Sequence, residues 1–243
     1  MKNTIKYFLQ QLFGYELYLF AFAIFKIKTL KNDSKEKDFF YFLNLIPTSN
    51  GVILDIGANL GIMTYYLSKK FSNNKVYAIE PVPSNLKVLE KIKKQFRLSN
   101  VTVFNIALGS EKQIATMILP KNHGTKMQGL SHIKHDSIEL WNDGEEFEVE
   151  MNTLDMLFPN QEIKAIKIDV ENFEYFVLKG GVQLLNDNKP LIYMELWNND
   201  NRINCMNFLS NLNYECFVIE NNQCVHFQVN HHKQQNFLFI AKN

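Results

Sequence analysis

A short loop after an apolar run is the first part of the sequence whose residues suit binding chemistry. The run Val52–Ile56 continues into a D-x-G-x-x-x-G pattern formed by Asp55, Gly57 and Gly61. Glycine has no Cβ, so the backbone at these positions can approach a ligand closely. In open parallel α/β sheets, ligands bind at the carboxyl ends of the strands. We therefore predict that this loop, with Asn59 inside it, holds a cofactor.

Two further strand ends are expected at the same site. The next run ends in Glu80, about 20 residues beyond the loop, the separation at which an acidic side chain reaches a ribose. A carboxylate can accept hydrogen bonds from both ribose hydroxyls, so Glu80 is the candidate ribose ligand. A third run ends at Ala107, which we expect near an adenine. The alternative is that Asp55, Glu80 and Ala107 are ordinary strand-end residues and that the glycines only form turns.

The glycine spacing distinguishes between cofactors. The dinucleotide fingerprint is G-x-G-x-x-G, which places a pyrophosphate on a helix N-terminus. Here Asn59 stands where the middle glycine would be, so a pyrophosphate would fit poorly. S-adenosylmethionine carries no phosphate, and its amino-acid end suits this turn. We predict S-adenosylmethionine as the cofactor, with a nicotinamide-dependent oxidoreductase and a non-catalytic Rossmann-like binding protein as alternatives.

Acidic residues cluster at the end of the fourth apolar run, 165–170. Asp169 and Glu171 stand where this run would leave the sheet, and Lys167 is a candidate partner for a carboxylate. Methyl transfer depends mainly on alignment of the two reactants, and a hydroxyl acceptor must also lose a proton, which a positioned carboxylate can remove. We predict Asp169 and Glu171 as catalytic residues and Asp169 also as a cofactor ligand. The alternative is that these acids, with Glu174, favour the positive end of the next helix.

The same segment resembles a known family. Lys167–Glu174 reads K-I-D-V-E-N-F-E and precedes V-L-K-G-G, similar to the I-K-I-D-V-E-G-F-E and V-L-x-G hallmark of the FkbM family of methyltransferases. The D-I-G-A-N-x-G loop, the I-E-P strand end and the N-x-A-L-G third strand also match, so the resemblance covers about Val52 to Glu195. It implies a Rossmann-like enzyme that transfers a methyl group from S-adenosylmethionine, typically to a hydroxyl of a sugar or a secondary metabolite. Asn172 replaces the usual glycine, and Asn tolerates left-handed backbone better than most residues.

Apolar runs alternate with helical patterns, which implies a parallel sheet covered on both faces. Buried strands are predicted at 52–56, 75–80, 101–107, 165–170 and 191–196, and helices at 60–71 and 84–96. An insertion at about 110–157 has ends, 114–119 and 146–154, that alternate like antiparallel strands. The runs 214–220 and 236–241 lack a crossover helix, so they should pair antiparallel. We predict an α/β fold of the Rossmann-like class I methyltransferase type, with a mostly parallel seven-stranded sheet, helices on both faces and an antiparallel C-terminal strand pair.

Length and composition fit one catalytic domain. Hydrophobic residues make up 46% of the 243 residues, enough for a sizeable core. We divide the chain into an N-terminal apolar helical segment and linker, 1–37, and a methyltransferase domain, 38–243. The 26 Lys and Arg against 25 Asp and Glu argue against a nucleic-acid partner. Three cysteines without metal-ligand spacing favour a reduced, cytoplasmic compartment.

Residues 1–30 are dense in apolar side chains flanked by lysines. A spanning helix needs about 20 nearly charge-free residues, and Gly14 and Glu16 interrupt this run. A signal peptide needs a small-residue cleavage site, and none follows Phe25. We expect a helix that packs on the domain or self-associates, or one that makes peripheral contact with a membrane.

The insertion carries a group of residues that could ligate a metal: His123, His132, His135, Asp136 and Asp143. Their spacing matches no strong metal motif, so we predict no metal and interpret the insertion as an acceptor-binding lid. Glu195 and Trp197 also border the site by topology. The acceptor is expected to be a small molecule or a glycan. O-methylation is favoured over N-methylation because no D/N-P-P-Y/F turn follows the fourth strand.

Overall fold

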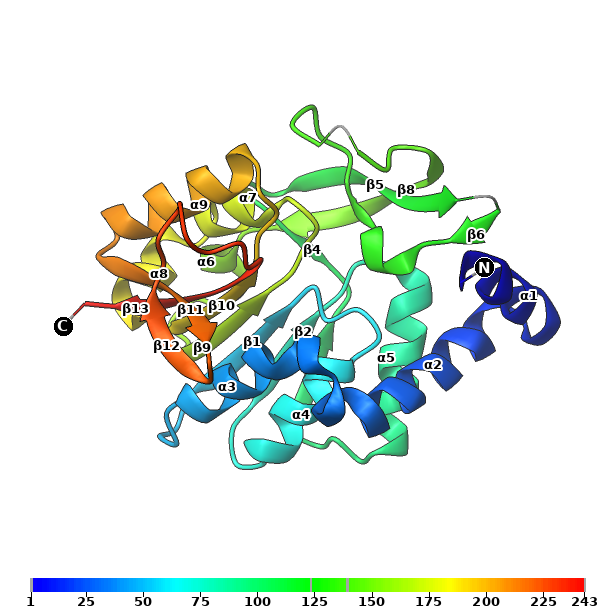
Figure 1. The fold of residues 1–243 in the computed structure, drawn as a ribbon, viewed down its shortest axis with the longest axis horizontal. Helices are drawn as coiled ribbons and strands as arrows, with labels where there is room; N and C mark the ends of the chain where they lie inside the picture. Colours follow the sequence, from blue (N-terminus) through cyan, green and yellow to red (C-terminus); the bar gives the residue numbers. More distant parts are fainter. Residues whose placement is uncertain (1, 123, 139, 243) are drawn as a thin grey trace.

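The computed structural model describes residues 2–122, 124–138 and 140–242, and they form two sheets with helices around them (Figure 1). The larger sheet has eight strands in the order β12-β11-β13-β10-β9-β1-β2-β3. The parallel strands are β1 (Val52–Ile56), β2 (Val76–Ile79), β3 (Val101–Phe104), β9 (Ile163–Ile168) and β10 (Leu191–Glu195). The antiparallel strands are β11 (Tyr214–Glu220), β12 (Gln223–His226) and β13 (Asn236–Ala241).

This arrangement confirms the predicted mostly parallel sheet with an antiparallel C-terminal pair. β13 lies between β10 and β11 and runs antiparallel to both. The sheet has eight strands rather than the expected seven, because the residues after β11 fold back as β12 and pair with it.

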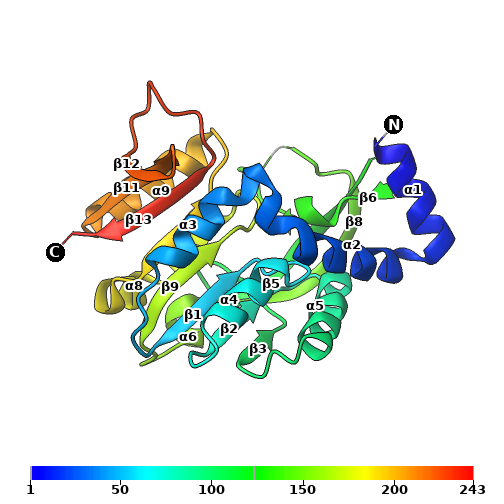
Figure 2. The same ribbon diagram turned by 60° about the horizontal axis from the view of Figure 1, so that its bottom comes forward.

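Helices cover both faces of the larger sheet, as predicted. One face packs against α3 (Lys37–Leu45), α4 (Ile62–Lys70) and α5 (Pro83–Gln95), and the other against α6 (Leu154–Leu157), α7 (Glu174–Lys179), α8 (Val182–Asn188) and α9 (Asp200–Asn211). Successive strand residues point to opposite faces of the sheet. Ile53 therefore packs in the core on the side of α3, α4 and α5, and Leu54 in the core on the side of α6 to α9. Figure 2 shows α3 and α4 in front of the sheet.

The insertion forms a second sheet. Its strands are β4 (Ala107–Leu108), β5 (Gln113–Asn122), β6 (Thr125–Lys126), β7 (His132–Ile133) and β8 (Gly144–Asn152), with the short helix η3 (Gln128–Leu130) between β6 and β7. β5 and β8 pair antiparallel from Gln113–Met151 to Pro120–Gly144, as the alternating ends of the insertion predict. Ala107 departs from its predicted strand: β3 ends at Phe104, and β4 pairs with β8. The second sheet is thereby joined directly to the end of β3.

The N-terminal helices α1 (Lys2–Phe13) and α2 (Tyr15–Thr29) meet at Gly14, and the short helices η1 (Leu30–Asn32) and η2 (Ser34–Glu36) lead on to α3. Leu19 of α2 is fully buried against α5, so α2 packs on the domain, one of the predicted arrangements. The Gln10 side chain exchanges two hydrogen bonds of 3.3 Å with the backbone of Lys126, which joins α1 to the insertion. Across the described residues, no single helix has the length and apolarity to cross a membrane. Residues 6–13 and 15–32 together have enough length and apolarity for a span, but the two helical parts are bent by 120° relative to each other.

Candidate active site

A cavity of about 580 Å³ lies at the carboxyl ends of β1, β2 and β9. Among its lining residues are six of the predicted site residues: Gly57, Asn59, Glu80, Ala107, Asp169 and Glu171. Asp55 and Gly61 do not line it. The insertion contributes Gln128, Gly129 and Ser131 to the lining, so the segment predicted as a lid borders the same cavity as the predicted cofactor residues.

The glycine loop is shaped by close packing against its neighbours. Gly57 has φ 73°, and a Cβ there would overlap the carbonyl oxygen of Asp169. Gly61 has φ 79°, and a Cβ would overlap the Leu89 side chain on α5. Both glycines are therefore needed to bring the end of β1 against β9 and α5. Gly57 also leaves bare main chain toward the cavity.

Glu80 ends β2 and is 3% exposed. Its carboxylate accepts hydrogen bonds from Asn59 N at 2.7 Å, Val82 N at 2.9 Å and Asn85 Nδ2 at 3.2 Å. Burial raises the pKa of Glu80 to about 7, although these hydrogen bonds act in the opposite direction. Two carboxylate oxygens offer about four acceptor sites, so Glu80 can still accept from a ribose hydroxyl.

Lys167 connects the ends of β1 and β9. Its buried ammonium donates to Gly57 O at 2.9 Å and lies 3.4 Å from both Asp55 Oδ1 and Asp169 Oδ2. Burial lowers the pKa of Lys167, but the Asp169 and Asp55 carboxylates outweigh it, and the pKa is raised overall. Asp55 is fully buried and also accepts from Thr64 Oγ1 at 2.6 Å. The structure thus places Asp55 behind the loop, where it positions Lys167.

The loop after β9 has two successive residues in the left-handed region, Glu171 at φ 54° and Asn172 at φ 73°. Glu174 stabilises this turn by accepting from Val170 N and Asn172 N. Asn172 Oδ1 accepts from Asn199 Nδ2 at 2.8 Å, so the asparagine that replaces the family's glycine keeps the turn and adds a contact. Burial, and then repulsion by Asp169 and Glu195, raises the pKa of Glu171. These effects favour the protonated form of the Glu171 carboxyl.

A second cavity, of about 970 Å³, meets the first at Asp169. Its lining has charges of both signs: Lys35 and Lys167 are basic, and Glu36, Asp38, Asp169 and Glu195 are acidic. Burial is the largest cause of the raised pKa of Glu36, of Asp38 and of Glu195, which is raised to about 7. No sequence pattern marks Lys35 and Glu36 as site residues, because they lie in the polar segment interpreted as a linker.

The histidines of the insertion are used in local hydrogen bonds. His132 bonds to Leu130 O at 2.8 Å and to Asn142 Oδ1 at 3.0 Å, and His135 bonds to Ser137 Oγ at 2.8 Å. Within the described ranges, no group of three or more His, Cys, Asp or Glu residues could hold a metal ion. His123 lies outside the described residues.

Buried polar atoms around the first cavity identify the kind of ligand that it fits. Five described lining residues carry a buried oxygen for which no hydrogen-bond partner is found: Asn59, Asn85, Gln128, Ser131 and Glu171. Buried polar atoms nearly always have a partner, and these oxygens can accept. S-adenosylmethionine offers matching donors in its ribose hydroxyls, adenine amino group and ammonium. Ile106, Val82 and Phe173 add apolar surface for an adenine.

A Rossmann-like sheet with this cavity at its carboxyl edge is the fold of class I S-adenosylmethionine-dependent methyltransferases. The chain belongs to the FkbM methyltransferase family, since the methyltransferase FkbM domain model matches residues 55–238. The family predicted from the Lys167–Glu174 hallmark is thereby confirmed.

Two known proteins show this similarity. Methyltransferase 1 from Beauveria bassiana (strain ARSEF 2860) is 27% identical over 143 residues, which cover 53% of this chain and 57% of that protein. The crystal structure of the FkbM methyltransferase from Methylobacillus flagellatus KT superimposes with a TM-score of 0.56 at 15% identity, covering 83% of this chain and 48% of that one. The chain thus spans only about half the length of each of these relatives.

Replacing Lys167 with methionine tests the ion pairs behind the loop. The substitution leaves Asp55 buried without a cation, so Lys167→Met is expected to lower the free energy of unfolding by about 3–5 kcal/mol. Asp55 would then take up a proton in the folded state, so the loss should be larger at pH 8 than at pH 5. Urea denaturation at the two pH values measures both effects.

The double variant Lys167→Met/Asp55→Asn is the matched control. It removes both charges, so it should recover part of the lost stability and most of the pH dependence. A Lys167→Met variant as stable as the wild type at both pH values would show that Lys167 does not compensate Asp55.

Proposed function

We propose that this chain transfers a methyl group from S-adenosylmethionine to a hydroxyl of a sugar, in a glycan, a glycolipid or a secondary metabolite. The observation that carries the proposal is the position of Asp169. The Asp169 side chain is 33% exposed and lines both the first cavity and the charged second cavity. A carboxylate at this junction lies beside a cofactor and remains open to an acceptor.

Different residues of the two cavities would bind different parts of the cofactor. Glu80 would hold the ribose, and the apolar side chains near Ala107 would hold the adenine. The second cavity, with Lys35 and Glu36, matches the carboxylate and ammonium of the cofactor's amino-acid end. Bound S-adenosylmethionine supplies an electrophilic methyl group on a sulfonium.

Asp169 and Glu171 would then act differently on the acceptor. Asp169 would accept the proton of the acceptor hydroxyl, while bound S-adenosylmethionine would supply the methyl group and leave as S-adenosylhomocysteine. Burial favours the protonated form of Glu171, which would donate a hydrogen bond and orient the acceptor. The Asp169 and Glu171 carboxyls belong to one loop. Together they would align the acceptor with the cofactor.

Cofactor binding is tested by Glu80→Ala. The variant removes the ribose ligand, so S-adenosylhomocysteine affinity should fall by about 10- to 100-fold in titration calorimetry, because hydrogen bonds to a charged group are lost. Glu90→Ala, an exposed site on α5, is the control and should bind like the wild type. If folded wild-type protein gives no heat with either S-adenosylmethionine or S-adenosylhomocysteine, the proposed function is wrong.

The catalytic roles are separated by two near-isosteric variants. Asp169→Asn should lower kcat by about 10²- to 10⁴-fold, the usual contribution of a general base. Glu171→Gln should be much milder, because glutamine resembles the protonated carboxyl that burial favours. Methyl transfer to a glycan acceptor, followed with radiolabelled cofactor, measures both. A Glu171→Gln variant more damaged than Asp169→Asn would assign the base to Glu171.

We also propose that the protein is cytoplasmic and contacts a membrane peripherally through α1 and α2. Several of their large apolar side chains are exposed: Phe8 66%, Leu12 76%, Phe13 53%, Leu17 54% and Phe25 61%. These helices form one edge of the molecule (Figure 1). The exposed Lys28 and Lys31 on the same segment would face anionic headgroups.

Vesicle co-sedimentation tests the membrane contact. Wild-type protein should sediment with phosphatidylglycerol-containing vesicles, and Phe8→Ser/Leu12→Ser should reduce binding about tenfold through lost apolar burial. Val229→Ser, which changes an equally exposed apolar residue before β13, should have no effect. Wild-type protein that stays in the supernatant, or that forms stable dimers through these helices, would contradict the membrane proposal.

A further inference from the structure

A third cleft lies between α7, the start of α9 and the insertion loop around Ser137 and Leu140, with a volume of about 1180 Å³. Its described lining residues and those of the first cavity do not overlap. Asn172 lines the cleft, and its neighbour Glu171 lines the first cavity. Adjacent residues of one loop therefore line the cleft and the first cavity.

Asparagine side chains dominate the polar part of the cleft wall. Asn199 and Asn201 are held in place, since Asn199 Nδ2 donates to Asn172 Oδ1 at 2.8 Å and Asn201 bonds to both Glu174 and the backbone of Tyr175. For the described residues, no partner is found for the amino group of Asn172 or for the amide of Asn204. Each amide combines donors with an acceptor, which matches the hydroxyl groups of a polyol.

Trp197 provides the aromatic surface of the cleft. Tyr175 also lines it, but Lys179 Nζ lies 5.7 Å from the Tyr175 ring centre and Phe208 packs edge-on against the same ring. Within the described part of the chain, Trp197 is only partly buried and its ring has no aromatic or cationic partner. Ring C–H groups of a sugar pack on such a face while its hydroxyls bond to neighbouring amides.

The charge of the cleft favours a neutral ligand. Its described lining contains no Lys or Arg, and Asp200 is the one charged residue in that lining. Phosphorylated ligands are usually held by Arg or Lys. A sugar ring without a phosphate is the ligand class that these residues fit.

We infer that this cleft binds a neutral sugar ring of the acceptor, stacked on Trp197 and hydrogen-bonded to Asn172 and Asn204. The inference rests on the proposed function, because it takes the bound ring to belong to the methyl acceptor. Since Asn172 adjoins Glu171, a ring held here would contact the same loop that carries the predicted catalytic acids. Specificity for the acceptor would then lie in α9 and the insertion loop.

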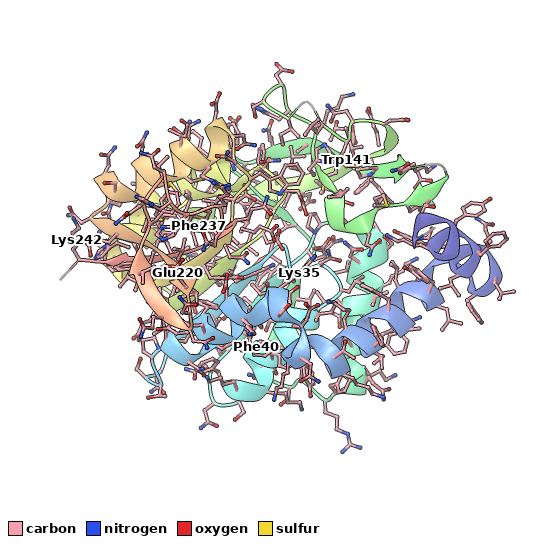
Figure 3. All side chains as sticks on the ribbon, viewed as in Figure 1. Lys35, Phe40, Trp141, Glu220, Phe237 and Lys242 are labelled. Atoms are coloured by element: carbon pink, nitrogen blue, oxygen red, sulfur yellow. The ribbon has the colours of Figure 1, made fainter. Side chains whose placement is uncertain are left out.

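Tryptophan fluorescence tests the cleft, because the sequence has two tryptophans. Trp141 lies on the insertion (Figure 3) and does not line the cleft. In Trp141→Phe, Trp197 is the remaining tryptophan, and methyl glycosides of neutral hexoses and deoxyhexoses, titrated with S-adenosylhomocysteine present, should give a saturable change. In Trp197→Phe the same titration should give none.

Asn204→Leu in the Trp141→Phe background should weaken glycoside binding about tenfold through lost hydrogen bonds, whereas Asn211→Leu, exposed at the far end of the same helix, should not. The inference is overturned if no glycoside changes the Trp197 signal. It is also overturned if cyclohexanol or glucose phosphate changes that signal as strongly as the glycosides do.

Two further results separate this inference from the proposed function. Glycosides that bind at Trp197 but are never methylated would leave the cleft intact and refute sugar methylation. Glycoside methylation that is unchanged in Trp197→Ala and Asn204→Leu would support the function and refute the cleft.

Discussion

The arrangement of the site depends on one buried cation. Lys167 Nζ lies between the carboxylates of Asp55 and Asp169 and donates to the Gly57 carbonyl. An ammonium this deeply buried is stabilised only when carboxylates compensate the loss of water. The three contacts therefore fix β1, the glycine loop and the end of β9 relative to one another. Asn59 N of the glycine loop donates a hydrogen bond to Glu80, which holds the end of β2 against the same loop.

The turn after β9 lies next to this close contact. A side chain at Gly57 would overlap the carbonyl oxygen of Asp169, so β1 and β9 approach closely at their ends. The turn then passes through Glu171 and Asn172, both in the left-handed region, a conformation that costs energy for non-glycine residues and is common at functional sites. Glu174 and Asn199 stabilise it from two sides, and it directs Glu171 toward one cavity and Asn172 toward another.

Much of this site could be predicted from local sequence. β1, β11 and β13 have the predicted ends, because each is a β-branched or aromatic run bounded by turn residues. The glycine loop, Glu80 and Asp169 were placed together by a rule about strand ends in parallel sheets. Asp55 shows the limit of that rule. Alternation along β1 places its side chain in the interior beside Lys167, and only the register of β1 against β9 reveals this pairing.

Residues brought in from distant segments could not be predicted in this way. Lys35 and Glu36 reach the second cavity because α2 packs on α5 and carries the following segment across the sheet. Gln128 and Ser131 reach the first cavity because β4 leaves the main sheet and pairs with β8. Both depend on tertiary packing that leaves no periodic signal at the residues concerned.

A crystal structure of the protein with S-adenosylhomocysteine tests the account most directly. It should show the ribose hydroxyls on Glu80, the amino-acid end near Gly57 and Lys35, and the sulfur facing Asp169 with the Lys167 contacts unchanged. A nucleoside bound away from Glu80, or a cofactor whose sulfur faces away from Asp169, would contradict the account.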